Sequence, residues 1–346
     1  MRHLALLIHG LFREVTLVRR LPILLLLILT ACGSKERVED VFHPMGGIPM
    51  RVTAYDISRS RFDEVFTEIK DRVAALEGSL SVFVQDSDLA VLNDKGVADV
   101  SEDTLAVLEQ ALRLCKNTDG AFDPTVASVI ELWTHAGKSG RPPAPDELAL
   151  ALERVGCNKV ETSHSRSRVR LTQQGMRLDL GGIAKGYIAT EAVRIMKKRG
   201  LTRGIVDAGG DVVVFSGKGD KPFRVGIKNP LAPVQVFAIL SVANGAVVTS
   251  GCYERFVEVQ GRRICHIIDP RTGQPAEGLL SVTVLTRVAA AADAYATALF
   301  VLGPEDGFSL AKSLPEVEAV FLMNGEGNQL RMKATPGLTG KLELAN

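Results

Sequence analysis

The sequence of 346 residues is poor in aromatic side chains and has no excess of either charge. Aromatic residues make up 5% of it, and 41 basic residues stand against 40 acidic ones, for a formal net charge of +1. A nucleic-acid-binding protein normally carries a basic excess, so this balance argues against DNA or RNA as a partner. With 46% hydrophobic residues the chain can bury a sizeable core, which excludes an intrinsically disordered protein.

Cysteine is scarce and follows none of the spacings of a metal or redox site. After Cys32 the sequence has four cysteines, at positions 115, 157, 252 and 265. No two of them form C-x-x-C, which argues against a zinc ribbon and a thioredoxin-type site, and four are too few for a disulfide scaffold. Cys252 and Cys265 flank a predicted hairpin turn at Gln260-Gly261, but at unequal offsets. We therefore expect free thiols.

The motifs of several common enzyme classes are also missing. The sequence has no G-x-x-x-x-G-K-[ST] and no G-x-G-x-x-G, which argues against a Walker A loop and a Rossmann dinucleotide site. It has no G-x-S-x-G and no H-E-x-x-H, so an esterase-type nucleophile and a zinc-protease helix lack support.

The N-terminal segment reads as a targeting signal. Residues 21–29 form an apolar run, interrupted at Pro22, behind a segment that contains Arg13, Arg19 and Arg20. The run is shorter than the roughly 20 residues that span a bilayer, but it has the length of a signal-peptide core. It ends in Leu29-Thr30-Ala31-Cys32, which resembles a bacterial lipobox, the signal for cleavage before the cysteine and for its acylation. An ordinary signal peptide with a chance cysteine is the alternative, and a cytoplasmic chain is a weaker one.

These features divide the chain into three parts. We expect a lipoprotein signal peptide at 1–31, a lipidated Cys32 with a tether over 32–44, and a single domain over 45–346. The protein would be exported and held at a membrane by its lipid.

Hydrophobic periodicity predicts helices and strands without an internal repeat. Helical spacing covers 62–76, 105–115, 183–199 and 288–302, a further short helix opens at 146, and 137–145 reads as a loop. Strands are predicted over 204–207, 212–215, 223–227, 234–242, 246–249, 256–259, 264–268 and 317–323, with a hairpin over 168–179. Helices followed by mostly adjacent strands favour the α+β class. We expect one compact domain with a mostly antiparallel sheet and packed helices.

The segment RLDLGGIAKG at 177–186 is the first candidate site, because a strand passes through a Gly-Gly turn into a helix. Free N–H groups at a helix start attract anions. Lys185 lies in the first turn of the predicted helix, where the macrodipole disfavours a cation unless an anion lies between them. The segment indicates a phosphate or pyrophosphate contact, although a structural tight turn explains it equally well.

The segment AAAADAYATALF at 289–300 is the second candidate, because it is apolar nearly all round and predicts a buried helix. A buried carboxylate is costly unless it is paired or bound to metal. Asp293 and Thr297 are four residues apart and share one face, and two such oxygens, left open to substrate phosphates, suit Mg²⁺. The alternative is an Asp293 that is hydrogen-bonded to a neighbouring loop and a Thr297 that packs through its methyl group.

The segment HIIDPRTG at 266–273 is the third candidate. Asp269-Pro270 followed by Gly273 is a turn signal, which puts His266 near the end of a strand. Histidine titrates near neutral pH and can act as a general base. The alternative is a histidine that only caps the turn.

Taken together, these motifs and others resemble the ApbE family of flavin transferases, in order over residues 45–302. The matching segments are Met45-Gly46, Ser81-x-Phe83 with Asp86-Ser87-Asp88-Leu89 and Leu92-Asn93, Gly120-Ala121-Phe122-Asp123-Pro124-Thr125, DLGGIAKGY at 179–187, DAGGD at 207–211, TSG at 249–251, HIIDPRTG at 266–273 and DAYAT at 293–297. Each motif is weak alone, but eight in sequence are specific. The chain departs from the pattern at Gly47, where a threonine is common, and at Cys252 and Cys265, where polar residues are expected.

The resemblance implies a role for each matched residue. Asp293, Thr297 and the backbone carbonyl of Ala184 would hold Mg²⁺, and Asp179 and Lys185 would contact FAD. His266 would be the base, with Asp269 nearby, whereas DAGGD is expected to be mainly structural. The remaining residues expected to line the FAD cleft are Met45, Ser81, Phe83, Gly120, Ala121, Phe122, Asp123 and Ile267.

The activity implied is Mg²⁺-dependent transfer of FMN from FAD to a threonine or serine hydroxyl of an acceptor protein, with release of AMP. Acceptors of the family are subunits of Rnf and sodium-translocating quinone reductase complexes, which implies an inner-membrane lipoprotein that faces the periplasm. Two alternatives remain: an FAD pyrophosphatase that yields FMN and AMP, and a flavin-binding lipoprotein without catalysis.

Overall fold

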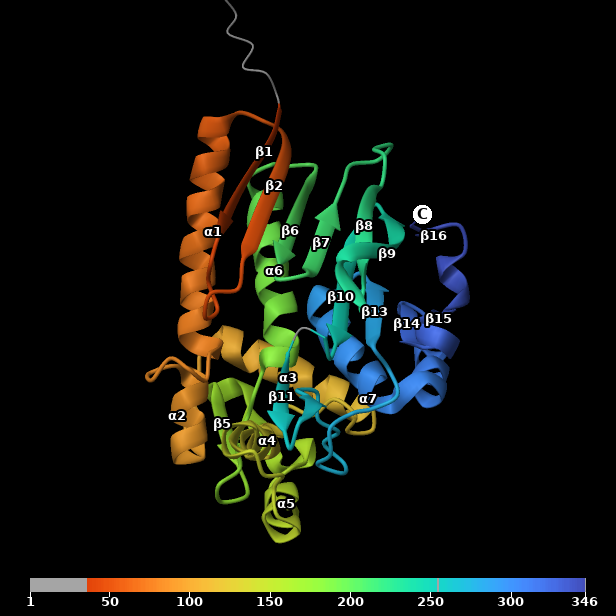
Figure 1. The fold of residues 1–346 in the computed structure, drawn as a ribbon. Helices are drawn as coiled ribbons and strands as arrows, with labels where there is room; N and C mark the ends of the chain where they lie inside the picture. Colours follow the sequence, from red (N-terminus) through yellow and green to blue (C-terminus); the bar gives the residue numbers. More distant parts are fainter. Residues whose placement is uncertain (1–35, 254, 346) are drawn as a thin grey trace, which may run out of the picture. The chain divides into compact units, whose positions relative to one another are not determined.

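The computed structural model describes residues 36–253 and 255–345, so the expected signal peptide and Cys32 lie outside the described residues. Mixed helices and antiparallel strands form the structure, as the sequence predicts (Figure 1). Within the described residues, no helix is both long and apolar enough to cross a membrane.

An eight-stranded sheet forms the centre of the domain, and each of its neighbouring strands is antiparallel. In spatial order its strands are β1 (Glu36–Phe42), β2 (Met50–Ile57), β6 (Gly204–Ala208), β7 (Asp211–Phe215), β10 (Gly245–Gly251), β13 (Ser281–Thr286), β14 (Glu318–Asn324) and β15 (Leu330–Ala334). A second, three-stranded sheet contains β8 (Phe223–Asn229), β9 (Ala232–Val242) and β16 (Leu342–Leu344).

Alternation along the central strands gives the large sheet two apolar faces, because successive side chains point to opposite sides. Val213, Val248 and Phe321 belong to the core shared with the helices α1 (Arg59–Leu80), α6 (Gly181–Lys198) and α7 (Ala289–Ser313). Their neighbours Val214 and Val247 belong to the core shared with β8 and β9. The domain is therefore layered as helices, large sheet and small sheet (Figure 1).

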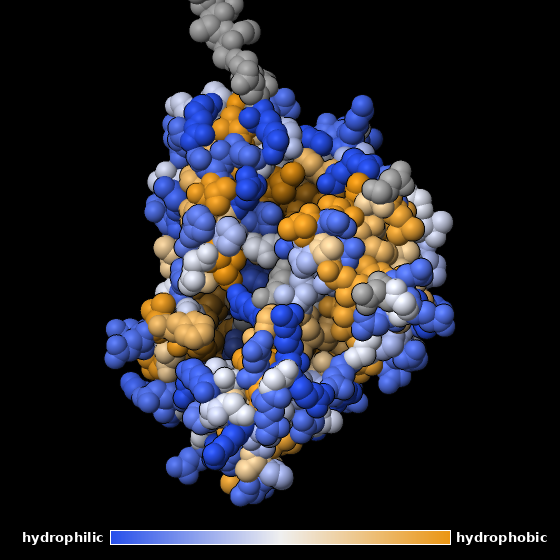
Figure 2. Space-filling model, in the orientation of Figure 1, coloured by the Kyte–Doolittle hydropathy of each residue, from blue (hydrophilic) through white to orange (hydrophobic). Residues whose placement is uncertain are grey.

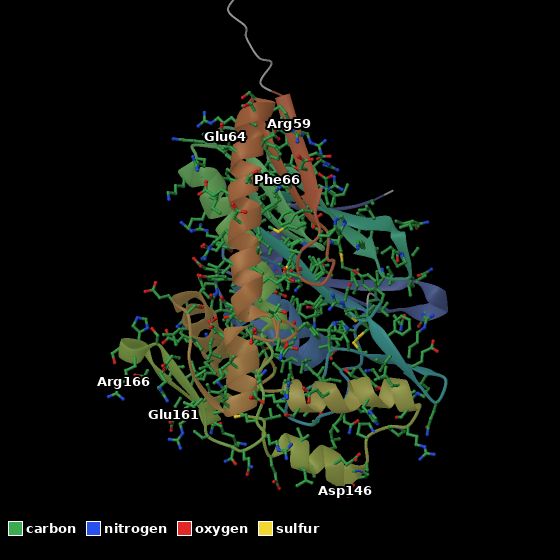
Figure 3. The ribbon with its side chains drawn as sticks, turned by 90° about the vertical axis from the view of Figure 1, so that its left-hand side faces the viewer. Arg59, Glu64, Phe66, Asp146, Glu161 and Arg166 are labelled. Atoms are coloured by element: carbon green, nitrogen blue, oxygen red, sulfur yellow. A yellow bond between two sulfur atoms is a disulfide. The ribbon has the colours of Figure 1, made fainter. Side chains whose placement is uncertain are left out.

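The smaller elements lie at one end of the large sheet and its helices, the lower end in Figure 1. Two short sheets contain β3 (Val97–Asp99), β4 (Val160–Ser163) and β5 (Arg168–Leu171), and β11 (Phe256–Val259) and β12 (Arg262–Cys265). The remaining helices are α2 (Asp88–Lys95), α3 (Glu102–Asn117), α4 (Ala127–Ser139) and α5 (Pro145–Leu152). Figure 3 shows α5, which carries Asp146, beside α4.

Several elements differ from the sequence-based expectation. The segment 36–42, expected within the tether, is an edge strand paired with β2. One side of this strand is apolar and includes Phe42, which packs against Phe66. The charged residues that alternate with that side, as is common at a sheet edge, obscure the strand pattern in the sequence. The hairpin expected over 168–179 is wrong: β5 pairs with β3 and β4 instead. Helix α4 occupies part of the expected loop over 137–145.

The four cysteines of the domain form two disulfides, so the expectation of free thiols is wrong. Cys115 pairs with Cys157, and Cys252 pairs with Cys265. The unequal offsets of Cys252 and Cys265 from the turn do not prevent pairing, because Cys265 already faces Phe256 in the β11–β12 ladder and Cys252 precedes that ladder. The chain outside the ladder absorbs the difference in length.

Candidate active site

The start of α6 is built around the Gly-Gly turn that the sequence singles out. The carboxylate of Asp179 accepts a hydrogen bond from the N–H of Gly181 (2.6 Å), which fixes the entry of the chain into the helix. A Cβ at Gly182 would lie 3.2 Å from the ring of Phe122 and 3.6 Å from Oγ1 of Thr297. The turn therefore brings the first turn of α6 against α7.

A second glycine lets the two helices touch. An added Cβ at Gly186 would lie 2.3 Å from the carbonyl oxygen of Ala289 in α7, a distance that real Cβ atoms do not tolerate. The close approach places Lys185 next to Asp293, whose carboxylate also accepts a hydrogen bond from the N–H of Gly186 (3.4 Å). The glycine thus sets the geometry of the charged pair.

The ammonium of Lys185 lies between two buried carboxylates. Its Nζ is 3.0 Å from Oδ1 and 3.1 Å from Oδ2 of Asp293, and 3.0 Å from Oδ2 of Asp211 at the start of β7. Asp293 and Asp211 are 2% and 3% exposed. When both are ionised, two carboxylates against one ammonium leave a net charge of −1, which is costly at such burial.

The pKa values of Asp211 and Lys185 follow from burial and from the charges of this cluster. Burial raises the pKa of Asp211 to about 7, and the negative charge of Asp293 adds to the rise. Burial alone would lower the pKa of Lys185, but the two carboxylates more than offset it and hold that pKa above its usual value. The cluster is thus short of one positive charge.

Two hydroxyl groups lie beside this cluster. Oγ1 of Thr297 lies 3.3 Å from Oγ of Ser250 at the end of β10, and it donates to the carbonyl of Asp293 one turn earlier. Ala184 lies in α6 between Gly182, which faces Thr297, and Lys185. Carboxylate, hydroxyl and carbonyl oxygens are the ligands that Mg²⁺ prefers, and a cation here would correct the charge deficit. The residues present therefore fit the expected metal.

His266 is presented to solvent directly after β12. Its Nδ1 lies 2.8 Å from the carbonyl oxygen of Arg255. A carbonyl can only accept, so Nδ1 carries the proton, and in the neutral ring Nε2 is then the basic nitrogen. The turn after His266 forms as predicted, with the N–H of Gly273 bonded to the carbonyl of Asp269 (2.8 Å). The Asp269 carboxylate pairs with Arg271 (2.8 Å).

The segment 120–123 supports the site mainly through its backbone and core packing. Ala121 and Phe122 are buried, and both carboxylate oxygens of Asp123 accept hydrogen bonds, from Thr125 and from the N–H of Cys157. Burial raises the pKa of Asp123 above its ordinary value. Gly120, at φ 73°, lies against Arg271, so this segment borders the His266 turn.

The other residues expected in the FAD cleft differ in exposure. Phe83 is 94% exposed, which leaves its ring available to an apolar ligand surface. Ser81 ends α1, and its hydroxyl accepts from the N–H of Phe83 (3.2 Å). Met45 is half-buried in a turn with φ 54°, and Ile267 is buried.

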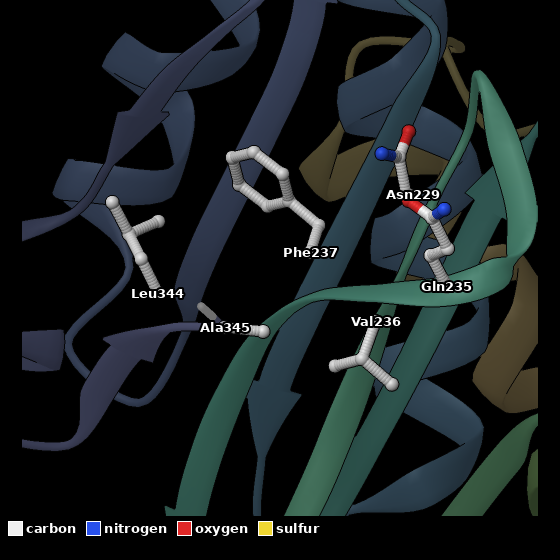
Figure 4. A pocket seen from close by; sticks show the side chains of 6 residues that line it. All are labelled: Asn229, Gln235, Val236, Phe237, Leu344 and Ala345. Carbon is white, nitrogen blue, oxygen red and sulfur yellow. The ribbon is translucent and has the colours of Figure 1, made fainter.

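Three other features carry no catalytic assignment. A pocket of about 570 Å³ lies on the small sheet, but its lining has no acid, base or nucleophile (Figure 4): Asn229, Gln235, Val236, Phe237, Leu344 and Ala345. Hydrophobic side chains gather on the surface over β8 and β9 (Figure 2). Among the described residues, Cys115, Asp123 and Cys157 form the one cluster with metal-ligand spacing, and its two sulfur atoms are bonded to each other.

Two site residues were missed from the sequence. Asp211 belongs to DAGGD, for which the sequence favours a structural turn. The glycines of that turn do have positive φ (64° and 98°), and Asp207 accepts from the N–H of Gly210. The sequence pattern does not show that Asp211, the second aspartate of this segment, is buried. Ser250 lay inside a noted motif, but its role depends on the position of α7.

Known proteins resemble this chain in sequence and in fold. Residues 46–321 match the model of the ApbE family. A protein of Treponema pallidum named FAD:protein FMN transferase is 35% identical over 91% of this chain and 92% of its own length. The ApbE protein of Thermotoga maritima has a TM-score of 0.78 at 31% identity, covering 89% of this chain and 99% of that one. The flavinyl transferase ApbE of Pseudomonas stutzeri has a TM-score of 0.77 at 26% identity, covering 89% of this chain and 97% of that one. The chain therefore belongs to the ApbE family.

Proposed function

We propose that this protein transfers FMN from FAD to a threonine or serine hydroxyl of an acceptor protein, with Mg²⁺ bound at Asp293 and with release of AMP. The observation that carries the proposal is the net negative cluster of Asp211, Lys185 and Asp293 beside the hydroxyl of Thr297. The names of the relatives, which are FAD:protein FMN transferases, support the same reaction.

Each of the main residues of the candidate site has a defined task in the proposed reaction. The acceptor hydroxyl oxygen attacks the FMN-side phosphorus of FAD, the bond to the bridging oxygen breaks, and AMP leaves with that oxygen. Mg²⁺ held by Asp293, Thr297 and the carbonyl of Ala184 would neutralise the pyrophosphate and the leaving AMP. Nε2 of His266 takes the hydroxyl proton, and the ammonium of Lys185 binds a phosphate oxygen.

The metal assignment is tested with Asp293→Asn in the full chain, purified in detergent. We expect transfer, read as a fluorescent acceptor band on a denaturing gel, to fall by at least about a hundredfold at millimolar Mg²⁺, because the buried ligand is lost. Glu305→Gln, an exposed substitution on the same helix, is the control and should retain full activity. Undiminished transfer by Asp293→Asn would contradict the assignment.

The role of His266 is tested by comparing binding with turnover. His266→Ala should lower kcat about a hundred- to a thousandfold and leave the Kd for FAD within about twofold, because a base acts on the proton rather than on the bound flavin. Equal losses in kcat and in affinity would show that His266 is a binding residue.

The same assay separates the two rival functions. FMN and AMP released without a labelled acceptor would identify an FAD pyrophosphatase, in which water replaces the acceptor hydroxyl. Bound FAD with neither product would identify a flavin carrier. The buried metal-type cluster favours catalysis, because a carrier has no need of a pyrophosphate activator.

We also propose that the protein is a lipoprotein of the inner membrane that faces the periplasm and modifies Rnf-type or sodium-translocating quinone reductase subunits. The lipobox-like residues up to Cys32 support the anchor. Radioactive palmitate should label the wild-type protein in the inner-membrane fraction, and labelling should fail for Cys32→Ser. Labelling that persists in Cys32→Ser would refute the anchor.

A further inference from the structure

We propose that the Cys252–Cys265 disulfide is a positioning device that holds His266 in register with the metal-binding end of β10. The inference rests on the proposed function of His266 as the base. Neither cysteine fits the family pattern noted in the sequence, and neither is used by the reaction itself.

The disulfide joins the two halves of the site through a short covalent path. Ser250, whose hydroxyl lies 3.3 Å from that of Thr297, is two residues before Cys252. The Cα atoms of Cys252 and Cys265 are 5.0 Å apart, and His266 is the next residue. A path of five residues, with the S–S bond as one of its links, thus joins His266 to Ser250, and Ser250 contacts Thr297 of the metal pair.

The hairpin that precedes His266 is joined to β10 by the disulfide and by the burial of Cys265 and Ile267 in the core shared with β10. In the part of the chain that the structure describes, β11 and β12 pair with each other in a sheet of their own and with no strand of the large sheet. They pack instead on α4, where a Cβ at Gly137 would lie 2.7 Å from Val257. Because a two-stranded hairpin is marginal alone, the disulfide adds a covalent constraint to the core packing of Cys265 and Ile267.

The disulfide also encloses the group that orients the imidazole. The carbonyl that accepts from Nδ1 belongs to Arg255, which lies within the loop closed by Cys252 and Cys265. Opening the loop lets this carbonyl move relative to His266. The ring then samples both tautomers, and Nε2 is no longer held as the basic nitrogen.

The test compares two double variants of the full chain. Cys252→Ser with Cys265→Ser should lower kcat about tenfold or more, because a small displacement of a catalytic group has effects of this size, while the Kd for FAD stays within about twofold. Its ¹⁵N NMR signals from His266 should change from an Nδ1-protonated ring to an average of two tautomers. Cys115→Ser with Cys157→Ser is the matched control, and it should lose thermal stability but keep the wild-type tautomer.

Reduction of the Cys115→Ser, Cys157→Ser variant, in which Cys252–Cys265 is the remaining disulfide of the described residues, provides the same comparison without a change at Cys252 or Cys265. A soluble phosphine or dithiol supplies two electrons, two protons complete the pair of thiols, and reoxidation should restore kcat and the tautomer. An unchanged tautomer and kcat after loss of the disulfide would overturn the proposal, and so would parallel losses of kcat, FAD affinity and melting temperature. The tautomer can be read even in a protein without transferase activity, so failure of the proposed function is distinguishable from failure of this inference.

Discussion

At the scale of single residues, Gly186 carries the strictest steric demand in the site. Its hydrogen faces the backbone of Ala289 and Ala290, where a methyl group would lie 2.3 Å from a carbonyl oxygen and 2.7 Å from a nitrogen. These atoms are backbone of a buried helix and have no rotamer through which to move. Any side chain at 186 must therefore separate α6 from α7.

We expect Gly186→Ala to destabilise the protein by about 2–4 kcal/mol in guanidinium unfolding, since overpacking against rigid backbone has effects of this size. It should also weaken Mg²⁺ binding, because Lys185 and Asp293 are brought together by the same helix contact. Gly78→Ala is the control: Gly78 is exposed in α1 with nothing within 4 Å of the added carbon, so it should stabilise by about 0.5–1 kcal/mol. Equal effects of the two substitutions would contradict the steric argument.

The residues of the site differ in how far the sequence revealed them. Asp293 and Lys185 were predictable because a carboxylate in an apolar helix and a cation at a helix start both violate local preferences. Asp211 broke no local rule, since an aspartate after Gly-Gly suits a turn. Its burial beside Lys185 depends on the packing of β7 against α6, which no local pattern encodes.

At the scale of elements, a charged cluster fastens α6 to α1 and α3. The guanidinium of Arg72 in α1 donates to both oxygens of Asp103 (2.7 and 2.6 Å) and to Glu191 (2.9 Å). Asp103 also accepts from the hydroxyl of Tyr187, two residues after Lys185, and Glu191 accepts from Arg194. The three helices thus share one ion network behind the active-site turn of α6.

We expect Arg72→Met to lower the free energy of unfolding by about 2 kcal/mol at pH 7, because it leaves two partly buried carboxylates without their main partner. Arg113→Met, on the exposed side of α3, is the control and should change stability by less than about 0.5 kcal/mol. Urea unfolding at matched pH measures both. A loss for Arg72→Met no larger than for Arg113→Met would contradict this role.

The sign of the accompanying pH effect follows from the shifts. Hydrogen bonds from Arg72 lower the pKa of Asp103, and for Glu191 burial is more than offset by Arg194 and Arg72, so that pKa is also lowered. Carboxyl groups with a lowered folded-state pKa stabilise the protein above their ordinary values of 3.8 and 4.5. This stabilisation is lost as the pH falls through the folded-state values. The acid-induced loss should be smaller in Arg72→Met.

Elements with strong periodicity were predictable, and those shaped by tertiary contacts were not. Helix α1 buries the apolar residues that its spacing predicts, and α3 begins where the hydroxyl of Ser101 accepts from the N–H of Thr104. Strand β1 was hidden by its charges, as is usual at a sheet edge. Strand β13 was not predicted, although it lies between β10 and β14 and is nearly fully buried.

At the scale of the whole molecule, the layers and the disulfides divide the work of holding the site together. The large sheet packs on helices through one face and on β8 and β9 through the other, so the strand ends that bear Asp211 and Ser250 are anchored by both cores. The outlying elements α4, α5 and the β11–β12 hairpin share a small core, and Cys265 at the end of the hairpin belongs to the main core. We therefore expect a disulfide to contribute most to stability in the elements that bury the least apolar surface.

The Cys115–Cys157 disulfide should therefore be the main covalent contribution to global stability. It closes a loop of 42 residues, whereas Cys252–Cys265 closes 13, and chain entropy predicts about 4 against about 3 kcal/mol. The longer loop contains α4 and part of the turn around Asp123, whose carboxylate accepts from the N–H of Cys157. Loss of this cross-link removes a constraint on a segment with little core of its own. Guanidinium unfolding of the two serine double variants measures the order. A larger loss for the 13-residue loop would show that native-state packing, not the entropy of the unfolded chain, sets the contribution of each disulfide.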